Sequence, residues 1–410
     1  MAEPYVRLLT EEEIPTATRI VSEGMLGSLS DEVVDAWSSV WEPEECHGAF
    51  TQDDRLVGVV RWFRDEVSVP GGAVPAGGVT AVAVASTHRR QGHLTRLIDE
   101  QLAHMVGAGV AIATLVAAEW PIYGRFGYGP AMDACGYDVD ARAARFLAPA
   151  SGTTELVTPA ELEPHLTAMH DARWARTPGP LRRRSGHWAQ RAAGVERWPN
   201  DSSDPGQLRG AVWRDDAGEV QGAVSYLVKD TWARNRPAGT AEVRLLVGAT
   251  PEAERELWRH LCSIDWVSTV TAGLRSVDDP LPLLLADSRV AAQVERSDAI
   301  WARILDLPAA FAARRSAVPG RMVVEVKDPQ GYAAGRYALE LGPDSGSASP
   351  TDEPAEVELS VAALGATYFG GQAPRRLADA GWISELAPGG VDRLTALLAT
   401  PTLPWSTTSY

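Results

Sequence analysis

The sequence predicts a mixed α+β protein in which one α/β unit occurs twice and a different α+β region follows. Its 410 residues exceed what a single hydrophobic core usually accommodates. Strand and helix patterns recur in the same order in two consecutive stretches, and the last quarter of the chain changes character. We therefore expect three domains, over residues 1–148, 149–288 and 289–410.

The first unit begins with two strands in "GAFTQDDRLVGVVRWF", joined at an Asp-Asp turn. A Gly/Pro-rich loop is expected over 70–78, and a buried strand of Val, Ala and Thr over 79–85. The next segment predicts a helix because its apolar residues recur at helical spacing, namely Leu94, Leu97, Ile98, Leu102 and Met105. A second buried strand is expected over 111–118. Pro121 then opens a short helix that breaks at Gly127.

The second unit repeats this order with "AVWRDDAGEVQGAVSYLV", then "AEVRLLVGA", then a helix in "TPEAERELWRHLCSI". Gly58 precedes Val84 by 26 residues, and Gly222 precedes Val247 by 25. The loops differ, since "GATPEAER" stands where the first unit has "ASTHRRQGH". The pattern indicates a duplicated fold whose second copy has lost the arginine-glycine turn.

The last region predicts a helix in "DLPAAFAARR", paired strands in "GRMVVEVKD" and "GRYALELG", and a loop in "PDSGSASPTDEPA". A helix is expected in "VDRLTALLA", and the chain ends in "PTLPWSTTSY".

Composition restricts the partners. The net charge of −16 disfavours nucleic acid and anionic membrane surfaces. The longest apolar run, 105–118, is too short to span a bilayer. Three distant cysteines and a polar N-terminus, unlike a signal peptide, predict a reducing, cytoplasmic location.

The segment "STHRRQGHLTRL" lies between a buried strand and a helix. A helix N-terminus presents unpaired backbone N–H groups and the positive end of the helix dipole. Gly92 allows a close backbone approach, and Arg89 and Arg90 add positive charge. Together these groups favour a phosphate.

A second strand and "YGRFGY" follow this loop, and the combination resembles the GNAT superfamily of N-acetyltransferases. "VTAVAVASTHRRQGHLTRL" with "AEWPIYGRFGYGPA" resembles more narrowly the Eis (enhanced intracellular survival) acetyltransferases, over nearly the whole chain. The resemblance implies an N-terminal GNAT domain, a degenerate second GNAT domain, and a C-terminal domain similar to sterol carrier proteins. Family members form hexamers, so a homo-oligomer is expected.

The resemblance implies acetyl-CoA as co-substrate. Its pantetheine would lie along Val82, Ala83 and Val84, and the Val84 N–H would face the thioester oxygen. Ala118 and Glu119 match further cofactor positions, although the family usually has Ser where Ala118 stands. The loop residues matching the pyrophosphate site are Arg89, Arg90, Gln91, Gly92, His93, Leu94 and Thr95, with Leu94 in place of the usual small residue.

Amine acetylation requires a base for the ammonium and an acid for the thiolate. By resemblance, Tyr123 is the acid and the terminal carboxylate of Tyr410 is the base. The histidines show no HExxH spacing, so no metal is expected.

The family acetylates amines such as aminoglycosides. Acidic and aromatic residues of the first two helices are candidates for holding a cationic amine, namely Glu23, Asp31, Asp35, Trp37 and Trp41. The same stretch also fits an ordinary amphipathic helix. Two alternatives to an acetyltransferase remain at this point. One is a non-catalytic CoA- or lipid-binding protein that retains the CoA loop, and the other is a scaffold for assembly.

Overall fold

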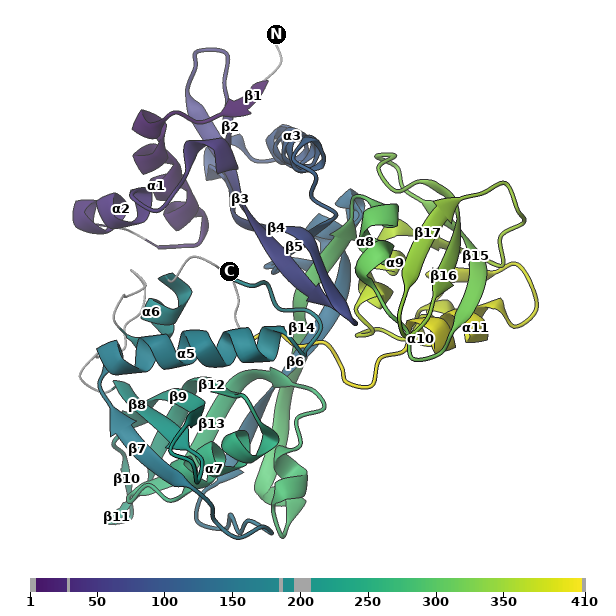
Figure 1. Ribbon diagram of the computed structural model, residues 1–410. Coiled ribbons are helices and arrows are strands. Elements are labelled where there is room, and N and C mark those ends of the chain that lie inside the picture. Colours follow the sequence, from purple (N-terminus) through teal and green to yellow (C-terminus); the bar gives the residue numbers. More distant parts are fainter. Residues whose placement is uncertain (1–4, 28–29, 184–186, 195–207, 408–410) are drawn as a thin grey trace.

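The computed structural model describes residues 5–27, 30–183, 187–194 and 208–407. Figure 1 shows three parts: the purple first unit, the teal second unit, and a green-to-yellow C-terminal part beside them. The fold is mixed α+β, as the sequence predicts.

Among the described residues, one sheet of twelve strands runs through the first two units. Its strands in spatial order are β1 (Tyr5–Leu8), β2 (Cys46–Phe50), β3 (Leu56–Val69), β4 (Gly72–Val84), β5 (Ile112–Leu115), β14 (Ala291–Ile304), β6 (Gly129–Asp140), β13 (Val267–Ser276), β12 (Gly239–Gly248), β9 (Val220–Lys229), β8 (Leu208–Arg214) and β7 (Thr153–Val157). A small hairpin, β10 (Trp232–Ala233) with β11 (Arg236–Pro237), stands apart from this sheet.

The two units exchange their last strands at the centre of this sheet. β14 pairs with β5 of the first unit, and β6 pairs with β13 of the second. β14 and β6 also pair with each other over most of their length. β14 lies within the expected third domain at 289–410, yet its hydrogen bonds belong to the large sheet.

Helices cover both faces of the first unit (Figure 1). α1 (Ile14–Gly24) packs on one face, against Ala81 and Ala83 of β4. α3 (His93–Gly107) packs on the opposite face, against Val60 and Val79. Strict alternation would put Val79, Ala81 and Ala83 on one face, but β4 is irregular at Ala81, where φ is 52° and the register with β3 shifts, so the strand contributes to both clusters. The other helices of the two units are α2 (Asp31–Ser38), α4 (Trp120–Tyr123), α5 (Pro159–Trp174), α6 (His187–Ala193) and α7 (Pro251–Cys262).

The predicted loop at 70–78 is wrong, because β4 begins at Gly72 and continues the hairpin with β3. Its glycines allow close packing rather than a turn. A Cβ at Gly78 would lie 2.4 Å from the Phe63 ring, and one at Gly77 would lie 2.7 Å from Met105. The predicted strand at 111–118 is shorter than expected and ends at Leu115.

The C-terminal part has its own five-stranded sheet, in the order β17 (Gly346–Pro350), β16 (Gly335–Leu341), β15 (Gly320–Lys327), β18 (Val357–Ser360) and β19 (Ile383–Glu385). The predicted pairing of "GRMVVEVKD" with "GRYALELG" is confirmed, since β15 pairs with β16. The expected loop "PDSGSASPTDEPA" instead contains β17, which forms the sheet edge. The helices are α8 (Leu307–Ala313), α9 (Val361–Tyr368), α10 (Pro374–Asp379) and α11 (Gly390–Leu398).

Candidate active site

β4 and β5 diverge where the sequence places the cofactor. They pair in parallel from Ala76 and Ile112 to Val79 and Leu115, and no further. Beyond this point β4 stays attached to β3, with Ala85 N–H donating to the Val57 carbonyl at 2.8 Å. Successive amides of a strand alternate in direction. The N–H of the preceding residue, Val84, therefore faces the β5 side, where a thioester oxygen is expected.

The loop after β4 leads into the exposed N-terminus of α3. Gly92 is the N-cap, with a φ of 84° and no side-chain cap. Arg90 also has a left-handed φ, of 62°. Arg89, Arg90, Gln91, Gly92 and Thr95 are exposed. The backbone amides and charges of this turn are thus available to an anion.

His93 opens α3 but is buried, and burial lowers the pKa of its imidazole. Its ring lies 6.2 Å from that of His88. The neutral ring faces protein, which leaves the backbone N–H as the group His93 offers to a ligand. Leu94 is half-buried and packs against the cluster beneath α3. This packing accommodates Leu94 at a position where the family usually has a small residue.

Tyr123 ends α4 and is buried. It belongs to the hydrophobic cluster that Val82 and Val84 flank, so it lies on the same side of β4 as the expected thioester. Burial, and to a smaller extent the charge of Glu119, raises the pKa of Tyr123 to about 12. The phenol is therefore protonated at neutral pH, as a general acid requires. Ala118 and Glu119 are exposed just past β5.

Tyr410 lies outside the described residues, but the segment before it is held firmly. Trp405 Nε1 donates to the Leu274 carbonyl at 2.7 Å, and the Trp405 N–H donates to the Pro178 carbonyl at 3.1 Å. Thr407 Oγ1 lies 2.8 Å from His170 Nδ1. The tail is docked up to three residues before its end.

The candidate substrate residues differ in how far they are buried. Glu23 is exposed near the end of α1, where the next residue, Gly24, packs on Ala83. Trp37 on α2 is half-buried. Trp41 is buried in the cluster beneath α1, with the Arg61 guanidinium 5.6 Å from its ring centre. That contact favours a packing role for Trp41.

The remaining carboxylates of this stretch are exposed. Asp31 pairs with Arg19 at 2.6 Å, and Asp35 is exposed on α2. A substrate role for all five candidates stays a prediction.

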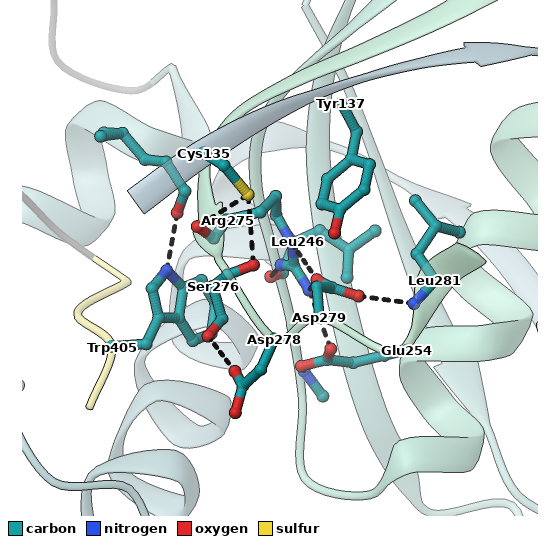
Figure 2. A network of polar contacts seen from close by, with 12 residues as sticks. Cys135, Tyr137, Leu246, Glu254, Arg275, Ser276, Asp278, Asp279, Leu281 and Trp405 are labelled. Atoms are coloured by element: carbon teal, nitrogen blue, oxygen red, sulfur yellow. Dashed lines mark hydrogen bonds and ion pairs between the residues drawn. The ribbon is translucent and has the colours of Figure 1, made fainter. Parts of the chain in front are cut away.

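Sequence reasoning missed a buried polar network in the second unit (Figure 2). Arg275 pairs there with Glu254 at 2.9 Å and with Asp279 at 2.6 Å, and contacts Trp405. Nothing in the local pattern marks these residues, because they come from β13, the turn after it, α7 and the tail. The one sequence feature that pointed to this network was the aromatic residue in the tail, Trp405.

Within the described ranges, no group of three or more His, Cys, Asp or Glu is placed to hold a metal ion. In the same part of the chain, no helix is both long and apolar enough to cross a membrane.

Comparison with known proteins defines the class. Residues 5–131 and 179–295 match two models described as acetyltransferase (GNAT) domains, and 307–407 match a sterol carrier protein domain. The chain is thus a GNAT N-acetyltransferase with two GNAT domains and a sterol-carrier-like domain, and GNAT domains imply an acyl-CoA co-substrate.

Full-length relatives narrow the class. An uncharacterised N-acetyltransferase of Streptomyces griseus is 36% identical, covering 98% of both chains. The N-acetyltransferase Eis of Mycobacterium tuberculosis is 32% identical, covering 90% of both. The crystal structure of Eis1 from Mycobacterium abscessus superposes with a TM-score of 0.87 at 32% identity, covering 99% of this chain and 100% of that one. The chain belongs to the Eis family of GNAT N-acetyltransferases.

Proposed function

We propose that the protein transfers the acetyl group of acetyl-CoA to amines of small cationic molecules, such as aminoglycosides or polyamines. The observation that carries this is the divergence of β4 and β5 beside the exposed, uncapped N-terminus of α3. Backbone groups of Val82 to Val84 would bind the pantetheine, and the turn from Arg89 to Thr95 would bind the pyrophosphate.

The reaction is direct attack. The amine nitrogen, after losing a proton, attacks the thioester carbonyl carbon, and the developing oxyanion is met by the Val84 N–H. The nitrogen of the tetrahedral intermediate releases its second proton to solvent, the C–S bond breaks, and the thiolate takes a proton from Tyr123. The products are an acetylamide and CoA. The carboxylate of Tyr410 assists the loss of the amine proton, directly or through water, and the phenol is reprotonated from solvent.

A homo-oligomer, a hexamer by family resemblance, and a cytoplasmic location accompany this proposal. No metal takes part in it. Wide acceptance of amines is consistent with the exposed carboxylates of α1 and α2.

The test is a panel of an aminoglycoside, a polyamine and a peptide amine with acetyl-CoA, following free thiol with a dye and acetylated amine by mass spectrometry. Amine-dependent release of thiol, matched by acetylated product, is expected. Acetyl-CoA binding without any release would favour the non-catalytic alternative, and release without acetylated amine would indicate hydrolysis only.

A further inference from the structure

The second GNAT unit retains the divergent strands of the first. β12 and β13 pair in parallel up to Val243 and Ala272, as β4 and β5 do up to Val79 and Leu115. Gly222 is opposite Gly248, just as Gly58 is opposite Val84, so both units have the same 26-residue spacing. Equivalent positions lie the same number of residues beyond the last parallel pair of each unit. On this basis Leu246 corresponds to Val82, Gly248 to Val84, and Arg275 to Ala118.

In the second unit the chain itself occupies the groups that a cofactor would use. Arg275 Nη1 donates to the Leu246 carbonyl at 2.7 Å and so bridges the diverging strands. Glu254 accepts the Gly248 N–H at 3.3 Å. Only two residues, Ala249 and Thr250, separate β12 from α7. This connection has no counterpart of the arginine-glycine turn, and Glu254 already accepts the N–H that an anion would need.

The C-terminal segment docks at this same place (Figure 2). The Trp405 ring is 3% exposed, and the guanidinium carbons of Arg275 and Arg173 lie 4.7 and 4.8 Å from its centre. Both arginines pair with Glu254, at 2.9 and 3.1 Å. Leu274, which accepts the indole N–H, has a φ of 51°, a left-handed backbone that a leucine rarely adopts.

The segment after α5 connects the docked tail to the first unit. Residues 179–182 hydrogen-bond with β3, through Gly179 N–H to the Ser68 carbonyl at 2.8 Å and Arg182 N–H to the Glu66 carbonyl at 2.9 Å. The backbone N–H of Trp405 donates to the carbonyl of Pro178, the residue that directly precedes this segment. The position of Trp405 is therefore fixed relative to the sheet of the first unit.

We propose that the second GNAT unit has become the binding site for the chain's own C-terminal segment, with Trp405 as the positioning residue that sets where Tyr410 lies. This rests on the proposed participation of the Tyr410 carboxylate. Chain ends usually fray, so a reactive terminus needs an anchor. Trp405 and Thr407, at the end of the described residues, supply such an anchor.

The test compares Trp405→Ala, Trp405→Phe and a matched control, Trp232→Ala, which removes an exposed indole of the same unit. Trp405→Ala is expected to lower kcat at least tenfold while acetyl-CoA affinity stays within about twofold. Trp405→Phe keeps an aromatic ring beside the two arginines and loses the indole hydrogen bond, so it should retain most of kcat. The control should match the parent. Equal kcat in Trp405→Ala and the parent, or a parallel loss of acetyl-CoA binding, would overturn the proposal.

Adding the peptide PTLPWSTTSY to full-length Trp405→Ala separates the anchor from the base. The peptide should bind saturably and restore turnover, and the same peptide with Ala in place of Trp should do neither. A peptide with an amidated C-terminus should bind without restoring turnover. If the amidated form restores turnover equally, the anchor stands and the base role of Tyr410 fails. If no peptide binds, the anchor proposal fails whatever Tyr410 does.

Discussion

The Arg303 guanidinium and the Asp328 carboxylate form an ion pair of 2.9 Å in which neither side chain is exposed. Arg303 belongs to β14 at the centre of the large sheet, and Asp328 follows β15 of the C-terminal part. Asp328 also accepts the backbone N–H groups of Gln330 and Ala333. The pair thus ties the sterol-carrier-like domain to the strand shared by both GNAT units.

Replacing Asp328 by Ala should lower the free energy of unfolding by about 3–5 kcal/mol, because Arg303 then remains buried without its counter-charge. Urea unfolding followed by fluorescence and circular dichroism measures this. Glu340→Ala is the control, since Glu340 pairs with Arg321 at an exposed site and should cost at most about 1 kcal/mol. Equal effects of the two changes would refute a special role for the buried pair.

The anion-binding turn is tested by changing Arg90 to Glu and Gly92 to Val together. The new charge repels the pyrophosphate, and Val at a φ of 84° strains the turn. Charge-assisted hydrogen bonds contribute roughly 1.5–3 kcal/mol each, so acetyl-CoA affinity should fall at least about tenfold by calorimetry.

Arg289→Glu, which changes the same charge at an exposed site of the second unit, is the control for net charge. Unchanged acetyl-CoA affinity in a folded double variant would end the assignment of this turn.

Tyr123→Phe removes only the hydroxyl, so the fold should persist. General acid catalysis typically contributes about 10²–10⁴-fold, and kcat should fall into that range while acetyl-CoA affinity barely moves. Because burial raises the pKa of Tyr123 to about 12, the phenol should not produce an alkaline limb below that pH. Turnover within twofold of the parent, with chemistry rate-limiting, would remove Tyr123 from the mechanism. Tyr332→Phe, in the C-terminal part, is the control.

The free terminus is tested by appending a few residues after Tyr410, which replaces its carboxylate by an amide. An α-carboxylate is a weak base, with a pKa of about 3.3–3.7 when free, so its position matters more than its strength. The extended protein should keep acetyl-CoA binding and lose most transfer activity, whereas a protein with an N-terminal extension of equal length should keep both. Transfer at the control rate would direct the search for a base to the carboxylates of the first unit.

The sequence predicted the repeated units because hydrophobic period and turn residues are local properties. The exchange of β6 and β14 was missed, because it depends on how the sheet edges of the two units pair with each other, which no local pattern encodes. Gly77 and Gly78 suggested a loop because their contacts with Met105 and Phe63 come from distant residues. The loop at Gly92 was recognisable from its own residues. The closure of the second unit by Arg275 and Glu254 was not, because ordinary charged residues become a network only by burial.

A buried aromatic cluster predicts acid sensitivity of the first unit. The His47 ring lies 5.2 Å from that of His104, which lies 5.4 Å from Trp62. Burial, with a smaller contribution from His104, lowers the pKa of His47 to about 4. Burial also lowers the pKa of His93, His170 and His260.

Each of these histidines is neutral in the folded protein but binds a proton near pH 6.5 when unfolded. The unfolded state therefore gains protons as the pH falls, and the stability contributed by His47 is present above pH 6.5 and lost between pH 6.5 and about 4. A shift of that size corresponds to about 3 kcal/mol. His47→Phe keeps an aromatic ring and removes the titration, so its unfolding free energy should decline less steeply over this range. The other three histidines should leave part of the slope. Urea unfolding at pH 8 and at pH 4.5 measures the difference between parent and variant. An identical slope in both proteins would show that His47 is not the group that makes the first unit sensitive to acid.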